Sequence, residues 1–272
     1  MPLDEFTLRL RENKVGPNDR VIVNGGEPTV HRNFWQILDL INDTGATIDL
    51  FSNGMIFSDE NIAKRILSYE NLHLRIPLFG SRAETHDYLT GGTGHFVKTT
   101  NGLDHLCAHI RGHATLEIKL LMSKTTIDEN EAIYEMCINR WAHPAVRISL
   151  NPLLISECVI QNKDIFIEDY STMMVRSENL IRRAISDGVD FSVALVPYCS
   201  YPNNELLSMC RGRNCGGKMY YASPGQTKKI DRLDWRKPCL KCKYVNECNG
   251  FSKNYIAYFG TDVMKPIESV QE

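Results

Sequence analysis

The run Val21-Ile-Val-Asn-Gly-Gly-Glu-Pro-Thr29 is the most informative segment of the chain, because β-prone residues lead directly into two glycines, a carboxylate and a proline. Gly25 and Gly26 allow a positive φ and a close approach of backbone to ligand. Pro28 ends the strand, since it has no N–H for the ladder. Glu27 then follows the carboxyl end of a strand, where parallel sheets bind ligands, and its carboxylate can accept hydrogen bonds from an ammonium group. The run predicts a strand end open to a ligand; a glycine turn before a helix N-terminal proline is the alternative.

A second motif places three cysteines in one loop near the C-terminus, as Cys239-x2-Cys242-x5-Cys248. Thiolates at this spacing suit one metal centre, either zinc or an iron–sulfur cluster. We favour Cys199 as the fourth ligand, because it ends a predicted strand and opens the cysteine-rich segment. Cys210 and Cys215 are competing candidates. Ordinary thiols without a metal are the alternative reading of the motif.

Composition limits the classes of function. The length of 272 residues and the 43% of hydrophobic residues suit one α/β domain with a small appendage. A net charge of -2 gives no reason to expect a nucleic acid or an anionic membrane as a partner. We find neither an apolar run of transmembrane length nor a signal peptide, so we expect a cytoplasmic protein. In a reducing compartment the nine cysteines would be free thiols or metal ligands rather than disulfides.

Helix and strand patterns alternate through most of the chain. The predicted helices span residues 3–13, 32–44, 59–69, 96–110, 128–140 and 170–187. The predicted strands span residues 20–24, 47–51, 72–78, 115–121, 146–150 and 190–196. Repeated βα alternation predicts an α/β fold with a parallel sheet or barrel. We therefore expect a (β/α) barrel domain over residues 1–196 and a Cys-rich extension over residues 197–272, closed by a helix at 250–259.

Polar residues follow one face of three successive predicted strands. His73, Arg75 and Pro77 alternate with aliphatic residues in the first of these strands. The corresponding residues of the next two strands are Glu117, Lys119, Arg147, Ser149 and Asn151. A closed barrel fills its interior with branched apolar residues, so this lining predicts an open, partial TIM-type barrel with a ligand cleft. Edge strands whose polar residues face water are the alternative.

Together these motifs resemble the radical S-adenosylmethionine (radical SAM) superfamily. In that family a Gly-Gly-Glu-Pro run at the end of the second barrel strand holds the amino group of the cofactor's methionine moiety. The segment Leu50–Gly54 is similar to the family's third strand end, and Arg75–Gly91, followed by Gly94-His-Phe96, looks like the fourth strand and loop of peptide-modifying members. Val196–Cys199 and Cys239–Gly260 resemble a C-terminal auxiliary-cluster region of the SPASM or twitch type.

The resemblance implies cofactors, partners and a set of site residues. The SAM contacts would be Gly25, Gly26, Glu27, Ser52, Asn53 and Arg75. Arg75 is the inward-facing cation placed to pair with a carboxylate. An auxiliary [4Fe-4S] cluster, preferred to zinc, would take Cys199, Cys239, Cys242 and Cys248 as metal ligands. The implied activity of such a peptide maturase is reductive cleavage of SAM and hydrogen abstraction from a peptide or small-molecule substrate, with a reducing protein as electron donor.

One departure from the family pattern is large. The C-x3-C-x2-C motif that holds the radical SAM [4Fe-4S] cluster is not in this sequence, whose first cysteine is Cys107. We expect that cluster only if an N-terminal segment is missing, which would make the chain the C-terminal part of a longer enzyme. The alternative is a degenerate, non-catalytic iron-sulfur or zinc-binding protein that holds a peptide or protein partner. With the first strand absent, the edge beside Val21–Asn24 is expected to be unpaired, which invites aggregation or oligomerisation.

Overall fold

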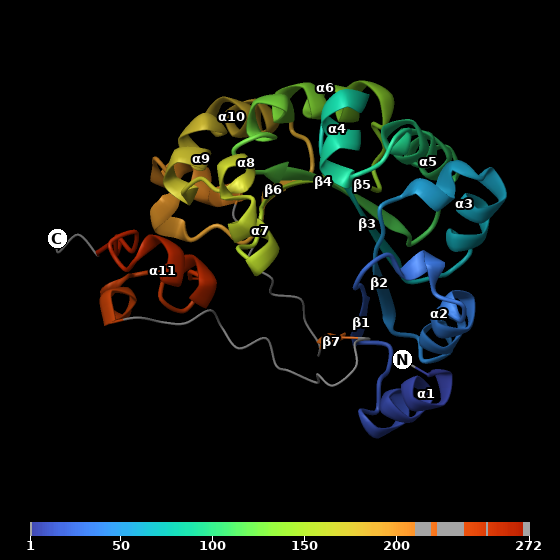
Figure 1. The fold of residues 1–272 in the computed structure, drawn as a ribbon. Coiled ribbons are helices and arrows are strands. Elements are labelled where there is room, and N and C mark those ends of the chain that lie inside the picture. Colours follow the sequence, from blue (N-terminus) through green and yellow to red (C-terminus); the bar gives the residue numbers. More distant parts are fainter. Residues whose placement is uncertain (1, 210–218, 222–236, 249, 269–272) are drawn as a thin grey trace. The chain divides into compact units, whose positions relative to one another are not determined.

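The computed structural model describes residues 2–209, 219–221, 237–248 and 250–268. The fold is α/β, with a parallel sheet of the partial TIM-barrel type that the sequence predicts. Its strands lie in the order β6-β5-β4-β3-β2-β1-β7 (Figure 1). Within the described residues no helix is long and apolar enough to cross a bilayer.

Two compact units interleave along the chain. Unit 1 comprises Met1–Lys119, Glu135–Arg147 and Cys215–Lys229. Unit 2 comprises Leu120–Tyr134, Ile148–Asn214 and Ile230–Glu272. The predicted boundary between residues 196 and 197 divides the chain by function, into a barrel and a metal-binding extension. The compact units do not test that division, so it stays a prediction.

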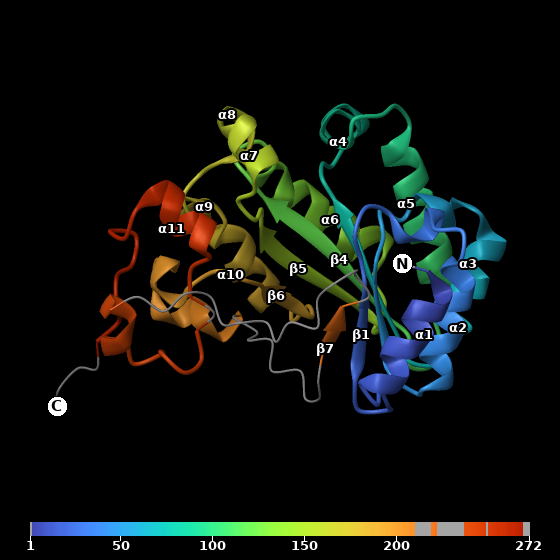
Figure 2. The ribbon, with the colours of Figure 1, turned by 60° about the horizontal axis from the view of Figure 1, so that its bottom comes forward.

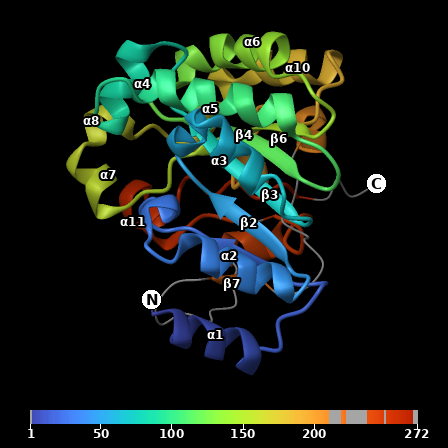
Figure 3. The same ribbon diagram turned by 90° about the vertical axis from the view of Figure 1, so that its right-hand side faces the viewer.

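Unit 1 holds the segment with which the sequence analysis began. Its strands are β1 (Arg20–Val23), β2 (Thr47–Phe51), β3 (Leu72–Leu78) and β7 (Met219–Tyr221). Its helices are α1 (Leu3–Glu12), α2 (Phe34–Asp43), α3 (Glu60–Ile66), α4 (Ala83–Thr90) and α5 (His95–His109). Helices α1, α2 and α3 lie on the same side of β1 (Figure 2), and α2 packs against β2 (Figure 3).

The remaining elements either lie in unit 2 or have residues in both units. Strands β4 (Thr115–Met122) and β5 (Val146–Pro152) and helix α6 (Asn130–Arg140) have residues in both units. Unit 2 adds α7 (Glu157–Gln161), α8 (Lys163–Phe166), α9 (Tyr170–Arg176), α10 (Glu178–Ser186), β6 (Phe191–Val193) and α11 (Lys253–Phe259).

The alternation of β3 sorts its side chains between two faces, as predicted. Leu72, Leu74, Ile76 and Leu78 are fully buried. In the parallel register with β2, Asp49 pairs with His73 and Phe51 pairs with Arg75. Because successive side chains of a strand point to opposite faces, these four residues share the face opposite the aliphatic one. Charged side chains therefore line the inner face of unit 1.

The structure corrects three expectations. The helix predicted over residues 170–187 is divided into α9 and α10 at Ser177. Helix α4 occupies a stretch that we expected to be a loop, and it ends at Gly91 with φ 72°. The β1 edge is not open, because β7 pairs with it in parallel and places Tyr220 opposite Val21. Three residues of the cysteine-rich segment thus cover the edge, and the expectation of aggregation through that edge loses its basis.

Candidate cofactor site and cysteine cluster

The Gly-Gly-Glu-Pro turn leaves room on the side of its glycines. Gly25 has φ 102° and Gly26 has φ 54°, so both adopt a backbone that favours glycine. A Cβ built on either residue meets no described atom within 4 Å. Glu27 closes the turn and caps the 3-10 helix η1 (Pro28–Val30), with Pro28 as its first residue. The turn therefore exposes bare backbone next to a carboxylate.

The Glu27 carboxylate is held by four donors from its own turn and from the end of β2. Its Oε1 accepts from the Thr29 backbone N–H at 3.2 Å, from Thr29 Oγ1 at 2.7 Å and from Ser52 Oγ at 2.9 Å. Its Oε2 accepts from the Asn53 backbone N–H at 2.7 Å. The structure thus brings Glu27, Ser52 and Asn53 together, as the sequence predicts. Since a carboxylate oxygen has two lone pairs, the remaining acceptor capacity lies mainly at Oε2.

Helix α5 fixes the turn that carries Ser52 and Asn53. Thr99 Oγ1 donates to the Asn53 carbonyl oxygen at 3.0 Å. Gly54 has φ 80°, and its N–H donates to Ser52 Oγ at 3.1 Å. A Cβ at Gly102 would lie only 2.4 Å from the Gly54 carbonyl oxygen, so helix and turn touch backbone to backbone. The orientation of Glu27 therefore depends on α5, which the sequence analysis did not connect with the site.

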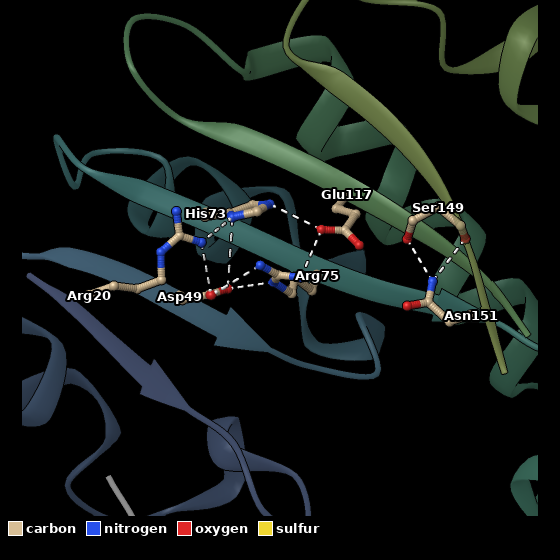
Figure 4. A network of polar contacts seen from close by, with 7 residues as sticks. All are labelled: Arg20, Asp49, His73, Arg75, Glu117, Ser149 and Asn151. Atoms are coloured by element: carbon tan, nitrogen blue, oxygen red, sulfur yellow. Dashed lines mark hydrogen bonds and ion pairs between the residues drawn. The ribbon is translucent and has the colours of Figure 1, made fainter. Parts of the chain in front are cut away.

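Arg75 lies on the inner face of unit 1 as predicted, but two carboxylates engage it there (Figure 4). Its Nε and Nη2 donate to Asp49 at 2.6 and 3.1 Å. Its Nη1 lies 2.9 Å from Glu117 Oε2. The proposed contact of Arg75 with a ligand carboxylate stays a prediction. Sequence reasoning missed Asp49; the signal was a lone charge between the aliphatic residues of a buried strand.

In unit 2, Asn151 and Ser149 form a separate polar pair. Asn151 Nδ2 donates to the Ser149 carbonyl oxygen at 3.0 Å and to Ser149 Oγ at 2.7 Å (Figure 4). Both residues are buried. Their amide and hydroxyl groups satisfy one another locally, as buried polar groups generally require.

The four predicted metal-ligating cysteines all belong to unit 2, and one of them, Cys248, accepts two backbone N–H groups. Cys248 Sγ accepts a hydrogen bond from the Tyr198 backbone N–H at 3.4 Å and another from the Gly250 backbone N–H at 3.3 Å. Burial raises the pKa of Cys199 to about 11, against a hydrogen bond from the Lys265 backbone that lowers it. The thiols at positions 239, 242 and 248 raise the pKa of Cys199 further, and burial likewise raises that of Cys248. Cys199 and Cys248 thus each lie within electrostatic range of the thiols at 239 and 242.

Proximity alone does not make a metal site. Among the residues that the structure describes, no three His, Cys, Asp or Glu side chains have an arrangement that could hold a metal ion. Cys239 Sγ instead lies 3.7 Å from Met264 Sδ. Cys210 and Cys215 lie outside the described residues. The ligand set therefore stays a prediction.

Comparison with known proteins adds distant relatives. No protein-family model matches the chain. Mycofactocin maturase MftC of Mycobacterium tuberculosis is 29% identical over 107 residues, which are 39% of this chain and 26% of that protein. AdoMet-dependent heme synthase of Methanosarcina barkeri is 27% identical over 116 residues, which are 43% of this chain and 32% of that protein. The matched segment thus spans about a quarter to a third of these relatives.

Solved structures share the fold over a larger part of the chain. Streptococcus suis SuiB bound to its precursor peptide SuiA matches with a TM-score of 0.59 at 14% identity, covering 81% of this chain and 50% of that one. SuiB bound to S-adenosylmethionine matches with a TM-score of 0.53 at 10% identity, covering 73% and 53%. Sequence relatives and fold together show that this chain is a distant relative of the radical SAM superfamily.

Proposed function

We propose that this chain carries the SAM-binding turn and the auxiliary-cluster region of a radical SAM protein that acts on a peptide. The observation that carries the proposal is the Glu27 carboxylate, which four donors orient beside two glycines with open space above them. An oriented carboxylate with spare acceptor capacity suits the ammonium group of an amino acid. Two similar proteins support a peptide substrate. MftC is named a maturase, and SuiB has been solved with its precursor peptide bound.

The residues present fit the methionine moiety of SAM. Glu27 Oε2 would accept from its ammonium group, and the backbone at Gly25 and Gly26 would approach it without a side chain between. Ser52 and Asn53 would keep the carboxylate in place. When bound with a [4Fe-4S] cluster, SAM supplies a radical that abstracts hydrogen. The sequence lacks the C-x3-C-x2-C motif for that cluster, so the proposal for this chain concerns binding of SAM and substrate.

The four predicted ligand cysteines offer a metal thiol ligands, although their described arrangement does not bring three of them into a metal-binding geometry. Burial first, and then the neighbouring thiols, raise the pKa of Cys199 and so favour its neutral form. A cation reverses this preference, because metals bind thiolates and binding releases the protons. Cys199, Cys239, Cys242 and Cys248 would then hold an auxiliary cluster. The N–H groups directed at the sulfur of Cys248 would stabilise the charge on a bound thiolate.

Equilibrium binding of SAM tests the proposed function. We expect the wild-type chain to bind SAM and Glu27→Gln to bind it roughly tenfold to a hundredfold more weakly, because a hydrogen bond to a charged group contributes about 1.5–3 kcal/mol. Glu70→Gln, at an exposed position, is the matched control and should bind like wild type. Methylthioadenosine, which lacks the amino group, should bind the wild type and the Glu27→Gln variant equally. Failure of the wild type to bind SAM would contradict the proposal.

A second candidate function is a non-catalytic metal-binding protein that holds a peptide. The observation behind it is the set of four cysteines in unit 2, which could bind a metal without radical chemistry. In that case the chain would bind zinc or an iron–sulfur cluster and a peptide, but not SAM. Sequencing the genomic DNA upstream of Met1 discriminates the two, because an in-frame C-x3-C-x2-C would establish the enzyme and a stop codon would favour the non-catalytic protein.

A further inference from the structure

The peptide group between Asn53 and Gly54 connects helix α5 with the Glu27 carboxylate. Its carbonyl oxygen accepts from Thr99 Oγ1 at 3.0 Å, and its N–H donates to Ser52 Oγ at 3.1 Å. Ser52 Oγ in turn donates to Glu27 Oε1 at 2.9 Å. Three hydrogen bonds therefore run in sequence from a side chain of α5, through one peptide group and one hydroxyl, to the carboxylate. We call this sequence the hydrogen-bond chain.

The groups in the hydrogen-bond chain fix the direction of each of its protons. A carbonyl oxygen only accepts, so Thr99 donates to it, and a backbone N–H only donates, so Ser52 Oγ accepts from Gly54. The single proton of the Ser52 hydroxyl then goes to Glu27, whose ionised carboxylate only accepts. Because the three donors point the same way along the chain, each hydrogen bond polarises the next.

The surroundings hold the Asn53–Gly54 peptide group in this orientation. Thr99 is 1% exposed and Ser52 is 4% exposed, so water does not compete for their hydroxyl groups. Gly54 has φ 80°, and a Cβ built on it would lie 2.9 Å from Ile76 Cγ2 of β3. The peptide group is thus confined on the side of β3, and Thr99 is the side chain that holds its carbonyl end.

The neighbouring threonine shows what a hydroxyl in this helix does without such a role. Thr100 is also buried, and its Oγ1 donates to the Val97 carbonyl oxygen of its own helix at 3.2 Å. A threonine within a helix commonly bonds the preceding turn in this way. Thr99 instead directs its hydroxyl out of the helix, to the turn that follows β2.

We propose that Thr99 is a positioning residue for the ammonium group of SAM. It acts through the hydrogen-bond chain and does not touch the ligand. The chain supplies Glu27 Oε1 with a donor from the protein and so leaves Oε2 as the oxygen directed to the ammonium group. This inference rests on the proposed function, because it requires that Glu27 binds SAM.

Equilibrium binding of SAM and methylthioadenosine to threonine variants tests the proposal. Thr99→Val keeps the shape of the side chain but loses the hydroxyl, and it should weaken SAM binding about threefold to tenfold, the effect of one neutral hydrogen bond. Methylthioadenosine lacks the ammonium group and should bind this variant like the wild type. Thr99→Ser keeps the donor and should restore SAM binding. Thr100→Val, the matched control, should leave both affinities unchanged.

A purely structural role of Thr99 gives a different pattern. Thr99→Val would then weaken both ligands by the same factor, or neither of them, and either result would overturn the proposal. The outcome is also distinct from a failure of the proposed function. In that case the wild type itself would not bind SAM, whereas SAM binding by the wild type with an unchanged ratio of affinities in Thr99→Val rejects only the role of Thr99.

NMR of the wild type tests the hydrogen-bond chain without any substitution, so the test stands even if Thr99→Val fails to fold. Contact of an ammonium group with Glu27 should alter the polarisation of Ser52 and of the Gly54 N–H that donates to it. We therefore expect SAM to shift the Gly54 amide resonance at least several-fold more than methylthioadenosine does. Equal shifts with the two ligands, or no shift with SAM, would show that the hydrogen-bond chain does not reach the ligand and would overturn the proposal.

Discussion

His86 shows how one buried side chain makes stability depend on pH. Its Nδ1 accepts from the Phe79 backbone N–H at 3.2 Å, and its ring packs edge-on against Phe79 and Phe96. Burial lowers the pKa of His86 from 6.5 to about 4. The unfolded chain therefore takes up this proton at a higher pH than the folded protein, and acid favours unfolding.

We expect His86 to contribute fully to stability above pH 6.5 and to lose its contribution as pH falls toward 4. The loss should be on the order of 2–3 kcal/mol, since one unit of pKa is about 1.4 kcal/mol. Urea unfolding of the wild type and His86→Gln between pH 4 and 7 measures it: the variant should be less stable at neutral pH but should depend less on pH. Equal slopes in the two proteins would contradict the assignment. His113→Gln should retain the wild-type slope.

At the scale of elements, the link between α4 and α5 depends on one carboxylate. Asp87 in α4 accepts through Oδ2 from the Gly94 N–H at 2.6 Å and through Oδ1 from the Phe96 N–H at 2.7 Å. Asp59 caps α3 differently, because one oxygen accepts from both Asn61 and Ile62. Asp87 therefore uses both carboxylate oxygens as acceptors, whereas Asp59 uses one, and the same substitution can be compared at the two positions.

Asn in place of Asp keeps one acceptor oxygen and loses the other. We expect Asp87→Asn to lower the free energy of unfolding by about 1–2 kcal/mol. Asp59→Asn should cost less than about 1 kcal/mol, since it loses mainly the charge near the helix N-terminus. Chemical denaturation of both variants gives the comparison. A cost at Asp59 equal to that at Asp87 would show that charge, and not the second hydrogen bond, stabilises the helix start.

Sequence patterns could predict elements whose stability is local or periodic, but not those that depend on distant contacts. The alternation in β3 and the turn at Glu27 are written in consecutive residues, and the structure has both. Helix α4 was missed because it is short and its N-cap residue, Arg82, makes no side-chain capping hydrogen bond, so its start has no local sequence signal. The pairing of Arg20 with Asp49 joins residues 29 positions apart, and no pattern within either strand specifies it.

At the scale of the whole molecule, the cysteine cluster is expected to bind metal and to order unit 2. After anaerobic reconstitution with iron and sulfide, the wild type should retain iron and labile sulfide, and Cys199→Ser should lose most of both. Cys158→Ser, at an exposed cysteine, should match the wild type. Chelation should then increase proteolysis within unit 2, because metal binding is coupled to folding. Retention of zinc without labile sulfide would reject the cluster and support the second candidate function.

The contact of Gly102 with the Gly54 carbonyl oxygen has a consequence for how this protein can change over time. Any larger residue at position 102 would push α5 away from the turn beneath it, whereas positions 25 and 26 have open space and are constrained mainly by backbone conformation. A library selected only for folding should therefore keep glycine at 54 and 102 yet accept asparagine at 26, where φ is 54°, because asparagine tolerates the left-handed region. Selection for ligand binding should add glycine at 26. The two kinds of selection would thus separate glycines that hold the scaffold from glycines that serve the ligand.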